Sequence, residues 1–347
     1  MANKEQIDRL LSLIDRYRTS GIDSQIDYSK FYLYSIITHS TAIEGSTVTE
    51  IENQMLFDQG LTASGRTVAE QMMNLDLKAA YEESISLAGD KVPVTVMELK
   101  NLARLVMKNT GSSYRTALGE FSSADGDLRL LNVTAGAGGK SYLSYSKVPA
   151  ALEEFCRWLN EERTKELTVP QRYCLSFDAH YYLVTIHPWA DGNGRMARLL
   201  MNHIQFEAGL IPTKVFKEDK GEYIKTLVQT RESGNLDIFR DFMLEETIKS
   251  IDEDLKSYRQ STEDPGLLGE AGFVPRNYAK PQRGKKEKSR EIILRLLSFN
   301  PKMTTRTLAE ETGISIKAVE KHLARLKKDG LLKREGSDRN GKWEVIG

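Results

Sequence analysis

Hydrophobic residues recur at helical spacing through most of this chain. In residues 1–18, for example, Ile7, Leu10, Leu11 and Ile14 fall on one face of a helix. The same kind of pattern predicts further helices at about 29–44, 66–88, 95–109, 149–162, 170–186, 195–208, 219–232 and 236–259. The fold class is therefore predicted to be mostly α-helical.

Residues 111–147 break this pattern. Glycines punctuate short runs such as Leu128–Val133 and Ser141–Tyr145, and three of them crowd together at Gly136, Gly138 and Gly139. This spacing predicts a small β-hairpin that forms a flap.

The composition changes again after about residue 260. Residues 261–289 hold three prolines, four glycines and a basic run, which is typical of a linker. We therefore expect an N-terminal helical region at 1–100, a core at 101–260, a linker at 261–288 and a second domain at 289–347.

The net charge is zero, from 49 basic and 49 acidic residues, but the two charges are unevenly distributed. Residues 283–347 contain 17 Lys and Arg against 9 Asp and Glu, a net of +8, so the remainder carries −8. This asymmetry indicates two modules with different partners.

Composition also excludes several classes of protein. A hydrophobic share of 40% and a charged share of 28% argue against global disorder. With two cysteines, the chain cannot be a disulfide scaffold, and it contains no CxxC pair that would indicate a zinc site. The charged N-terminus lacks an apolar signal core, and no stretch predicts a membrane span, so we expect a cytoplasmic protein with no membrane partner.

The most informative segment is HPWADGNGRMAR, residues 187–198, which lies between two predicted helices. Gly192 and Gly194 allow backbone N–H groups to approach an anion, and a helix N-terminus adds positive potential. Arg195 and Arg198 project from the first turn of the second helix. Asp191 could hold Mg²⁺ against phosphates, and His187 could accept a proton from a hydroxyl. The segment predicts a phosphate-binding catalytic loop.

This segment resembles the HPFxDGNGRxxR motif of the Fic/Doc superfamily, with Trp189 in place of Phe. The resemblance extends over about residues 30–250. It implies a Fic-type helical core that transfers AMP from ATP to a Ser, Thr or Tyr hydroxyl of a target protein. An intact Gly194, where kinase-like relatives carry a side chain, favours nucleotidyl transfer over phosphorylation.

The resemblance also assigns roles by position. His187 would be the general base, Asp191 the Mg²⁺ ligand, and Arg198 the contact to the terminal phosphate. The residues implied to bind ATP are Glu44, Ala137, Gly138, Gly139, Lys140, Asp191, Gly192, Asn193, Gly194, Arg195, Met196, Ala197, Arg198, Tyr223, Ile224 and Arg231. For Tyr223, Ile224 and Arg231, a position in the core or on a solvated helix face is an equally good interpretation.

A second motif, STAIEG at residues 40–45, fits the (S/T)xxxE(G/N) inhibitory pattern of the same family, with Ser40, Glu44 and Gly45 as its fixed positions. The resemblance implies that Glu44 pairs with Arg198 and occupies the position of the terminal phosphate. Residues around Glu44 would then form an N-terminal inhibitory helix. Whether Glu44 also supports AMP removal is left open, and the family resemblance leaves a homodimer open.

The C-terminal 59 residues show the order helix, helix, basic helix and hairpin. The third helix, in SIKAVEKHLARLKKDG, has a predicted buried stripe of Ile316, Val319, Leu323 and Leu326, and Asn340-Gly341 is a strong hairpin turn signal. This order resembles a winged helix-turn-helix (α+β) domain, which implies DNA as a partner; protein contacts are the alternative. A competing hypothesis for the whole chain is a DNA-binding transcriptional regulator whose Fic core senses nucleotide.

Overall fold

A computed structural model describes residues 4–22, 26–135, 140–263, 315–335 and 342–345, together with residues 293, 297, 304, 305, 308 and 309. The chain divides into two compact units, Met1–Arg276 and Asn277–Gly347, and each is described here by itself. Within the described residues, no helix has the length and apolar character needed to cross a membrane.

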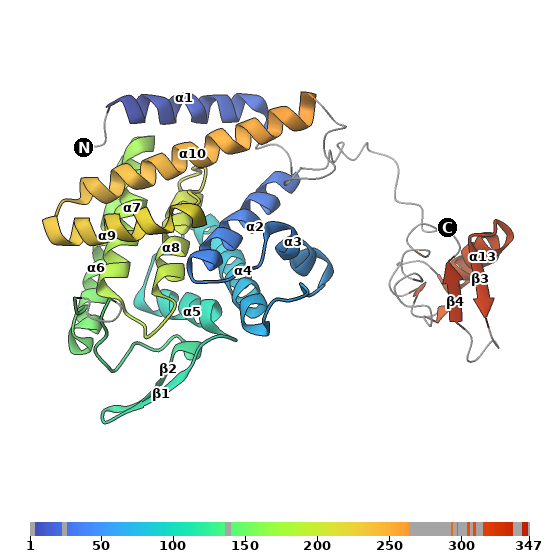
Figure 1. Cartoon of the computed structure of the whole chain (residues 1–347), viewed down its shortest axis with the longest axis horizontal. Helices are drawn as coiled ribbons and strands as arrows, with labels where there is room; N and C mark the ends of the chain where they lie inside the picture. The colour runs from blue at the N-terminus through green and yellow to red at the C-terminus, as the bar shows by residue number, and fades with distance from the viewer. Residues whose placement is uncertain are drawn as a thin grey trace. The chain divides into compact units, whose positions relative to one another are not determined.

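The first unit is mostly helical, as predicted from the hydrophobic pattern (Figure 1). Its helices are α1 (Lys4–Ser20), α2 (Ile26–Ile43), α3 (Glu50–Gln59), α4 (Val68–Gly89), α5 (Val96–Met107), α6 (Val148–Arg163), α7 (Val169–Ile186), α8 (Asn193–Glu207), α9 (Lys220–Ser233) and α10 (Leu236–Glu263). Helix α3 was not predicted. Its apolar Ile51 and Met55 are 57% and 41% exposed, so hydrophobic spacing does not mark its buried face.

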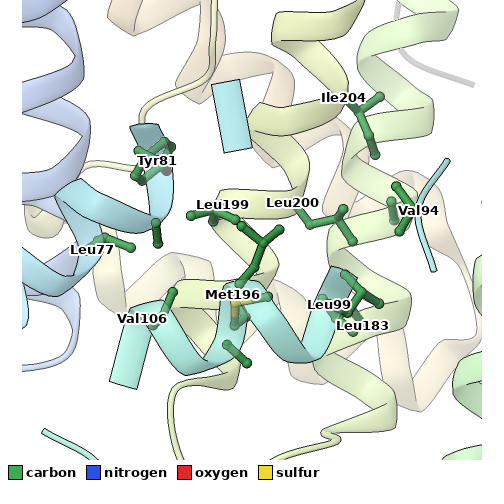
Figure 2. Packing of buried hydrophobic residues seen from close by; sticks show 14 of the residues in the cluster. Leu77, Tyr81, Val94, Leu99, Val106, Leu183, Met196, Leu199, Leu200 and Ile204 are labelled. Atoms are coloured by element: carbon green, nitrogen blue, oxygen red, sulfur yellow. The ribbon is translucent and has the colours of Figure 1, made fainter. Parts of the chain in front are cut away.

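Helix α8 is the centre of the first unit, and its buried face packs against α4, α5 and α7. Figure 2 shows Leu199 and Leu200 of α8 among Leu77 of α4 and Leu99 of α5. A second apolar cluster joins α7 to α1 and α10. Helices α1 and α10 run side by side in Figure 1. Because α8 is fixed on several sides, its N-terminal turn is held in a constant position.

Buried polar side chains hold α2 against α3 and α4. Asn53 of α3 donates its amide to the Thr38 hydroxyl at 2.7 Å and to the Asn74 carbonyl at 2.8 Å. The Thr41 hydroxyl of α2 also donates to the Asn74 oxygen, at 2.7 Å. Buried polar groups of this kind are costly unless they are paired, so the network fixes the position of α2.

The regular hairpin lies earlier than the predicted runs. Strands β1 (Ser113–Thr116) and β2 (Gly119–Ser122) pair antiparallel, with Ser113 opposite Ser122. The predicted runs at 128–133 and 141–145 instead form irregular limbs, and among their described residues Thr134 and Ser141 form an isolated antiparallel bridge. Residues 136–139, the glycine-rich tip, lie outside the described residues. We call residues 128–145 the flap.

In the second unit, α13 (Ile316–Lys328) is followed by β3 (Leu332–Glu335) and β4 (Lys342–Val345), which pair antiparallel. The predicted stripe is correct for Val319, Leu323 and Leu326, which are buried with Ile293, Leu297, Leu308 and Trp343. It is wrong for Ile316, which is 46% exposed because it begins the helix, next to the N-cap Ser315. The Asn340-Gly341 turn lies outside the described residues.

Gly126 allows the segment before the flap to lie against α5. Its φ is +73°, and a Cβ atom there would lie 2.1 Å from the Lys100 carbonyl oxygen. We expect Gly126→Ala to destabilise the first unit by about 2–4 kcal/mol, from left-handed backbone strain and a clash with main chain. Thermal unfolding of both proteins measures this difference.

The matched control is Gly89→Ala. Gly89 ends α4 with no neighbour within 4 Å of an added Cβ, so alanine there should leave the unfolding temperature unchanged or raise it slightly. Equal unfolding temperatures for Gly126→Ala and the unaltered protein would contradict the predicted clash.

Candidate functional site

The loop between α7 and α8 brings the motif residues together. Helix α7 ends at His187, whose φ is +53° and whose N–H donates to the Leu183 carbonyl at 3.0 Å. Helix α8 begins after Gly192, which has a φ of +80°. A Cβ at Gly192 would lie 2.6 Å from the Met107 sulfur, so only glycine fits both the conformation and the space.

Asn193 closes this loop from within. Its side-chain oxygen accepts from the Trp189 N–H at 3.1 Å, and its amide donates to the Trp189 carbonyl at 2.9 Å. Trp189 is buried, and its indole N–H donates to the Gly126 carbonyl at 3.2 Å. The tryptophan that replaces the motif phenylalanine is therefore an anchor of the loop.

His187 is half-buried and is held as a neutral imidazole. Its Nδ1 lies 3.2 Å from the Val184 carbonyl oxygen, an acceptor, so Nδ1 carries the proton and Nε2 has a free lone pair. Burial lowers the pKa of His187 to about 4, and the positive charges of Arg129 and Arg231 act in the same direction. The Val184 hydrogen bond and Asp191 raise it, but by less. The imidazole can therefore accept a proton near neutral pH.

Arg198 is a buried cation of the site, with 2% of its surface exposed. It donates to the Ser40 hydroxyl at 2.8 Å and to the Ser40 carbonyl at 3.0 Å. Its third partner is the Glu44 carboxylate at 2.6 Å. Burial raises the pKa of Glu44, but Arg198 outweighs this and lowers it overall, so the pair stays ionised.

The Glu44 carboxylate also lies against the beginning of α8. A Cβ built on Gly194 would be 2.6 Å from Glu44 Oε1 and 3.2 Å from the Arg198 guanidinium. The space at Gly194 is therefore filled by a carboxylate. A helix N-terminus next to a buried arginine favours an anion, and here the protein supplies its own.

Tyr223 lies behind Arg198, not on the surface of the site. It is 2% exposed, accepts a hydrogen bond from the guanidinium at 3.4 Å, and contacts His180 Nε2 at 2.8 Å. Burial lowers the pKa of His180 to about 3, so it is a neutral acceptor for the tyrosine hydroxyl. On the same helix, Ile224 is 46% exposed.

Arg195 and Asp191 differ in their surroundings. Arg195 is buried and donates to the Val106 carbonyl at 3.3 Å, whereas the Asp191 side chain is 61% exposed and 4.0 Å from Arg195. Met196 and Ala197 point into the core and can offer a ligand only their backbone. No group of three or more His, Cys, Asp or Glu side chains in the described residues could hold a metal ion unaided.

Part of the predicted flap contact lies outside the described residues, namely Ala137, Gly138 and Gly139. Lys140 is exposed, and its ammonium is 3.3 Å from Glu232 of α9. Arg231 of α9 donates to the Ser141 carbonyl and lies over the Tyr142 ring, 5.1 Å from its centre. The flap and α9 therefore meet beside the loop that carries His187.

Two residues of the site had no signal in the sequence. The Tyr142 ring stacks on the His187 imidazole, with centroids 3.9 Å apart and planes inclined by 17°. Arg129 is 1% exposed and donates to the His187 carbonyl at 2.7 Å. Neither belongs to a motif, and both act across long separations in the chain.

Comparison with known proteins identifies two segments. Residues 93–205 match the Fic/DOC family, and residues 287–333 match a winged helix-turn-helix DNA-binding family. The chain is similar to the protein adenylyltransferase Fic of Drosophila melanogaster, with 28% identity over an alignment of 276 residues that covers 73% of this chain and 51% of the relative. The Drosophila mojavensis protein of the same name is 27% identical. The chain thus spans about half the length of these relatives.

Solved structures support the same fold. A Fic-domain signaling protein from Bacteroides thetaiotaomicron is 23% identical, with a TM-score of 0.57 over 73% of this chain and 95% of the other. Fic-1 (residues 134–508) from C. elegans is 22% identical, with a TM-score of 0.60 over 74% and 73% of the chains. A Fic family protein from Desulfovibrio desulfuricans is 17% identical, with a TM-score of 0.57, and the match covers 99% of this chain and 95% of that protein's chain.

The surroundings of His187 predict its titration. Because burial and two nearby arginines disfavour the imidazolium, we expect the His187 ring to titrate near pH 4, well below the ordinary value of about 6.5. NMR of histidine-labelled protein measures this, and His187→Ala assigns the signal by removing it. Titration of that signal near pH 6.5 would contradict the described environment.

Proposed function

We propose that the first unit, in which residues 93–205 match the Fic/DOC family, transfers AMP from ATP to a Ser, Thr or Tyr hydroxyl of a target protein. The main support for this proposal is one observation. A single twelve-residue loop and helix start combine a neutral imidazole, a glycine-lined helix N-terminus and a buried arginine. These are the groups required to deprotonate a hydroxyl and to bind phosphates.

In this reaction the target hydroxyl oxygen attacks the α-phosphorus of ATP. The bond from that phosphorus to the bridging oxygen breaks, and pyrophosphate leaves. His187 Nε2 accepts the hydroxyl proton, which its low pKa permits because the ring is already neutral. The first N–H groups of α8 and the Arg198 guanidinium stabilise negative charge on the phosphates. Asn193 and Trp189 keep the loop closed around them.

The residues of this site could bind Mg²⁺ on one condition: the nucleotide has to supply most of the ligands of the ion. Asp191 offers an exposed carboxylate at the mouth of the loop, and Mg²⁺ commonly binds through one carboxylate together with substrate phosphates. Asp191 would therefore hold the ion. When bound, the ion would neutralise phosphate charge during transfer.

The described structure corresponds to an inhibited state in this proposal. The Glu44 carboxylate is 2.6 Å from Arg198 and fills the space at Gly194, so a terminal phosphate would have to displace it. The carboxylate would also repel that phosphate. The Glu44 side chain is 32% exposed and follows the end of α2, which leaves it room to move away.

We expect Glu44→Gly to raise AMP transfer by roughly 10- to 100-fold, because the variant frees Arg198 from a charge-assisted hydrogen bond of about 1.5–3 kcal/mol. The measurement is incorporation of labelled AMP into proteins of a lysate, with mass spectrometry of the modified residues. Glu44→Gln is the matched variant. It keeps the side-chain size and removes the charge, so its activity should be intermediate.

The double variant Glu44→Gly, His187→Ala provides the catalytic control. Its rate of AMP transfer should be about 10²–10⁴-fold lower than that of Glu44→Gly, while it still binds ATP. Equal activity of the unaltered protein and Glu44→Gly would refute inhibition by Glu44, and transfer retained without His187 would refute the assigned base.

A second function is supported by the C-terminal unit. Lys317, Lys321, Arg325 and Lys328 are all exposed on α13, whose buried face consists of other residues. The family match over residues 287–333 is to DNA-binding winged helices. We therefore propose that α13 contacts duplex DNA, with these cations at the phosphates.

We expect the full chain to retard duplex DNA, with an affinity that falls as salt rises. The variant Lys317→Ala, Lys321→Ala should bind more weakly and show a shallower dependence on salt, because two phosphate contacts are lost. Electrophoretic mobility shifts across a salt series measure both quantities. No shift at low salt for the unaltered chain would favour protein contacts for this unit.

A further inference from the structure

Arg129 connects the flap to the loop that carries His187. Its guanidinium donates to three main-chain carbonyls, those of His187 at 2.7 Å, Leu131 at 2.7 Å and Leu143. Its own N–H donates to the Pro188 carbonyl at 3.0 Å. Leu131 and Leu143 lie on opposite limbs of the flap. One side chain therefore joins both limbs of the flap to the end of α7.

The charge of Arg129 is unusual for a residue that is 1% exposed. In the described part of the chain, no carboxylate lies within ion-pairing distance of its guanidinium, and burial lowers its pKa. A buried cation without a counterion is costly, and carbonyl hydrogen bonds offset only part of that cost. Fold stability alone does not account for such a residue at this position.

The flap places Tyr142 on the catalytic imidazole. The Tyr142 N–H donates to the Val133 carbonyl at 3.0 Å, which joins the two limbs next to the carbonyls that Arg129 binds. The Tyr142 ring stacks on His187 with the ring centroids 3.9 Å apart, and the Arg231 guanidinium lies over the same Tyr142 ring, 5.1 Å from its centre. Tyr142 is therefore in contact with both the imidazole and a guanidinium.

Face-to-face stacking leaves the edge of the imidazole open. The Nε2 lone pair lies in the ring plane, while Nδ1 is held by the Val184 carbonyl. Tyr142 thus restricts the tilt of the ring without covering the nitrogen that accepts the proton. A general base has to be held in line with the hydroxyl it deprotonates, and small displacements reduce the rate strongly.

We propose that Arg129 and Tyr142 are positioning residues of the transfer reaction: Arg129 fixes the flap to the His187 carbonyl, and Tyr142 thereby holds the imidazole plane with Nε2 available. This inference rests on the proposed AMP transfer and extends it to two residues outside the motif. The charged groups around the imidazole are Arg129, Asp191 and Arg231, and Tyr142 is the other titratable neighbour.

The first test measures AMP transfer in the Glu44→Gly background, where activity is highest. Arg129→Met and Tyr142→Ala should each lower kcat by roughly 10- to 100-fold with little change in the KM for ATP. Arg129→Lys should be intermediate, because an ammonium keeps the charge but cannot fork to three carbonyls. Tyr142→Phe should keep most of the activity, because it preserves the stacked ring.

Arg104→Met is the matched control, since Arg104 is an exposed arginine of α5, and it should leave kcat unchanged. If Arg129→Met does not fold, the pair Tyr142→Ala and Tyr142→Phe still decides the question. Equal kcat values for Tyr142→Ala, Tyr142→Phe and the parent would overturn the positioning role of Tyr142. Full activity of folded Arg129→Met would overturn that of Arg129.

A second measurement separates this inference from the proposed function. Histidine NMR of the unreacted full-length protein follows the titration of the His187 ring. In Arg129→Met the pKa of His187 should rise because a nearby positive charge is lost. In Tyr142→Ala it should rise because the imidazole is less buried. In both variants the acid limb of the pH profile of kcat/KM, which reports the free enzyme, should move to higher pH by the same amount as the NMR titration. An unchanged His187 titration in both variants would overturn the inference. A shifted titration in a protein that transfers no AMP would refute only the proposed function.

Discussion

The contact on which the site depends is the pairing of the Arg198 guanidinium with the Glu44 carboxylate. Arg198 comes from the second turn of α8, and its partners come from the end of α2 and from α9. Glu44 is 154 residues from Arg198 in the sequence, whereas α9 is the next α-helix after α8. The remaining packing of the first unit holds the three helix ends close together, so that the buried Arg198 charge is neutralised by the Glu44 carboxylate.

A second buried arginine in the same unit is satisfied differently. Among the described residues, the Arg129 guanidinium donates to the main-chain carbonyls of His187, Leu131 and Leu143, which are part of the local backbone structure. The two residues therefore suit different tasks. The charge of Arg198 is balanced by a partly exposed carboxylate, as the proposed phosphate-binding role requires, whereas Arg129 joins segments of backbone.

Two kinds of feature could be predicted from the sequence: helices whose apolar residues recur at helical spacing, and breaks where proline or glycine interrupts that spacing. The long helices were identified by apolar spacing, and Pro188 with the glycines of the loop marked the break between α7 and α8. Helix α3 was missed because its apolar Ile51 and Met55 face outward. Arg129 and Tyr142 could not be found in this way. Their contacts join residues 58 and 45 positions apart, and no local pattern records such pairings.

Glu44 lies just beyond the last residue of α2, and α2 itself is fastened by the buried network of Thr38, Thr41, Asn53 and Asn74. Removing the carboxylate from Arg198 therefore requires rotation of one partly exposed side chain and leaves the helix in place. Rotamer changes of exposed side chains take picoseconds to nanoseconds, whereas helix displacements take microseconds to milliseconds. Under the proposed inhibition, Glu44 and a terminal phosphate would compete for Arg198 through a side-chain rotation that needs no displacement of α2.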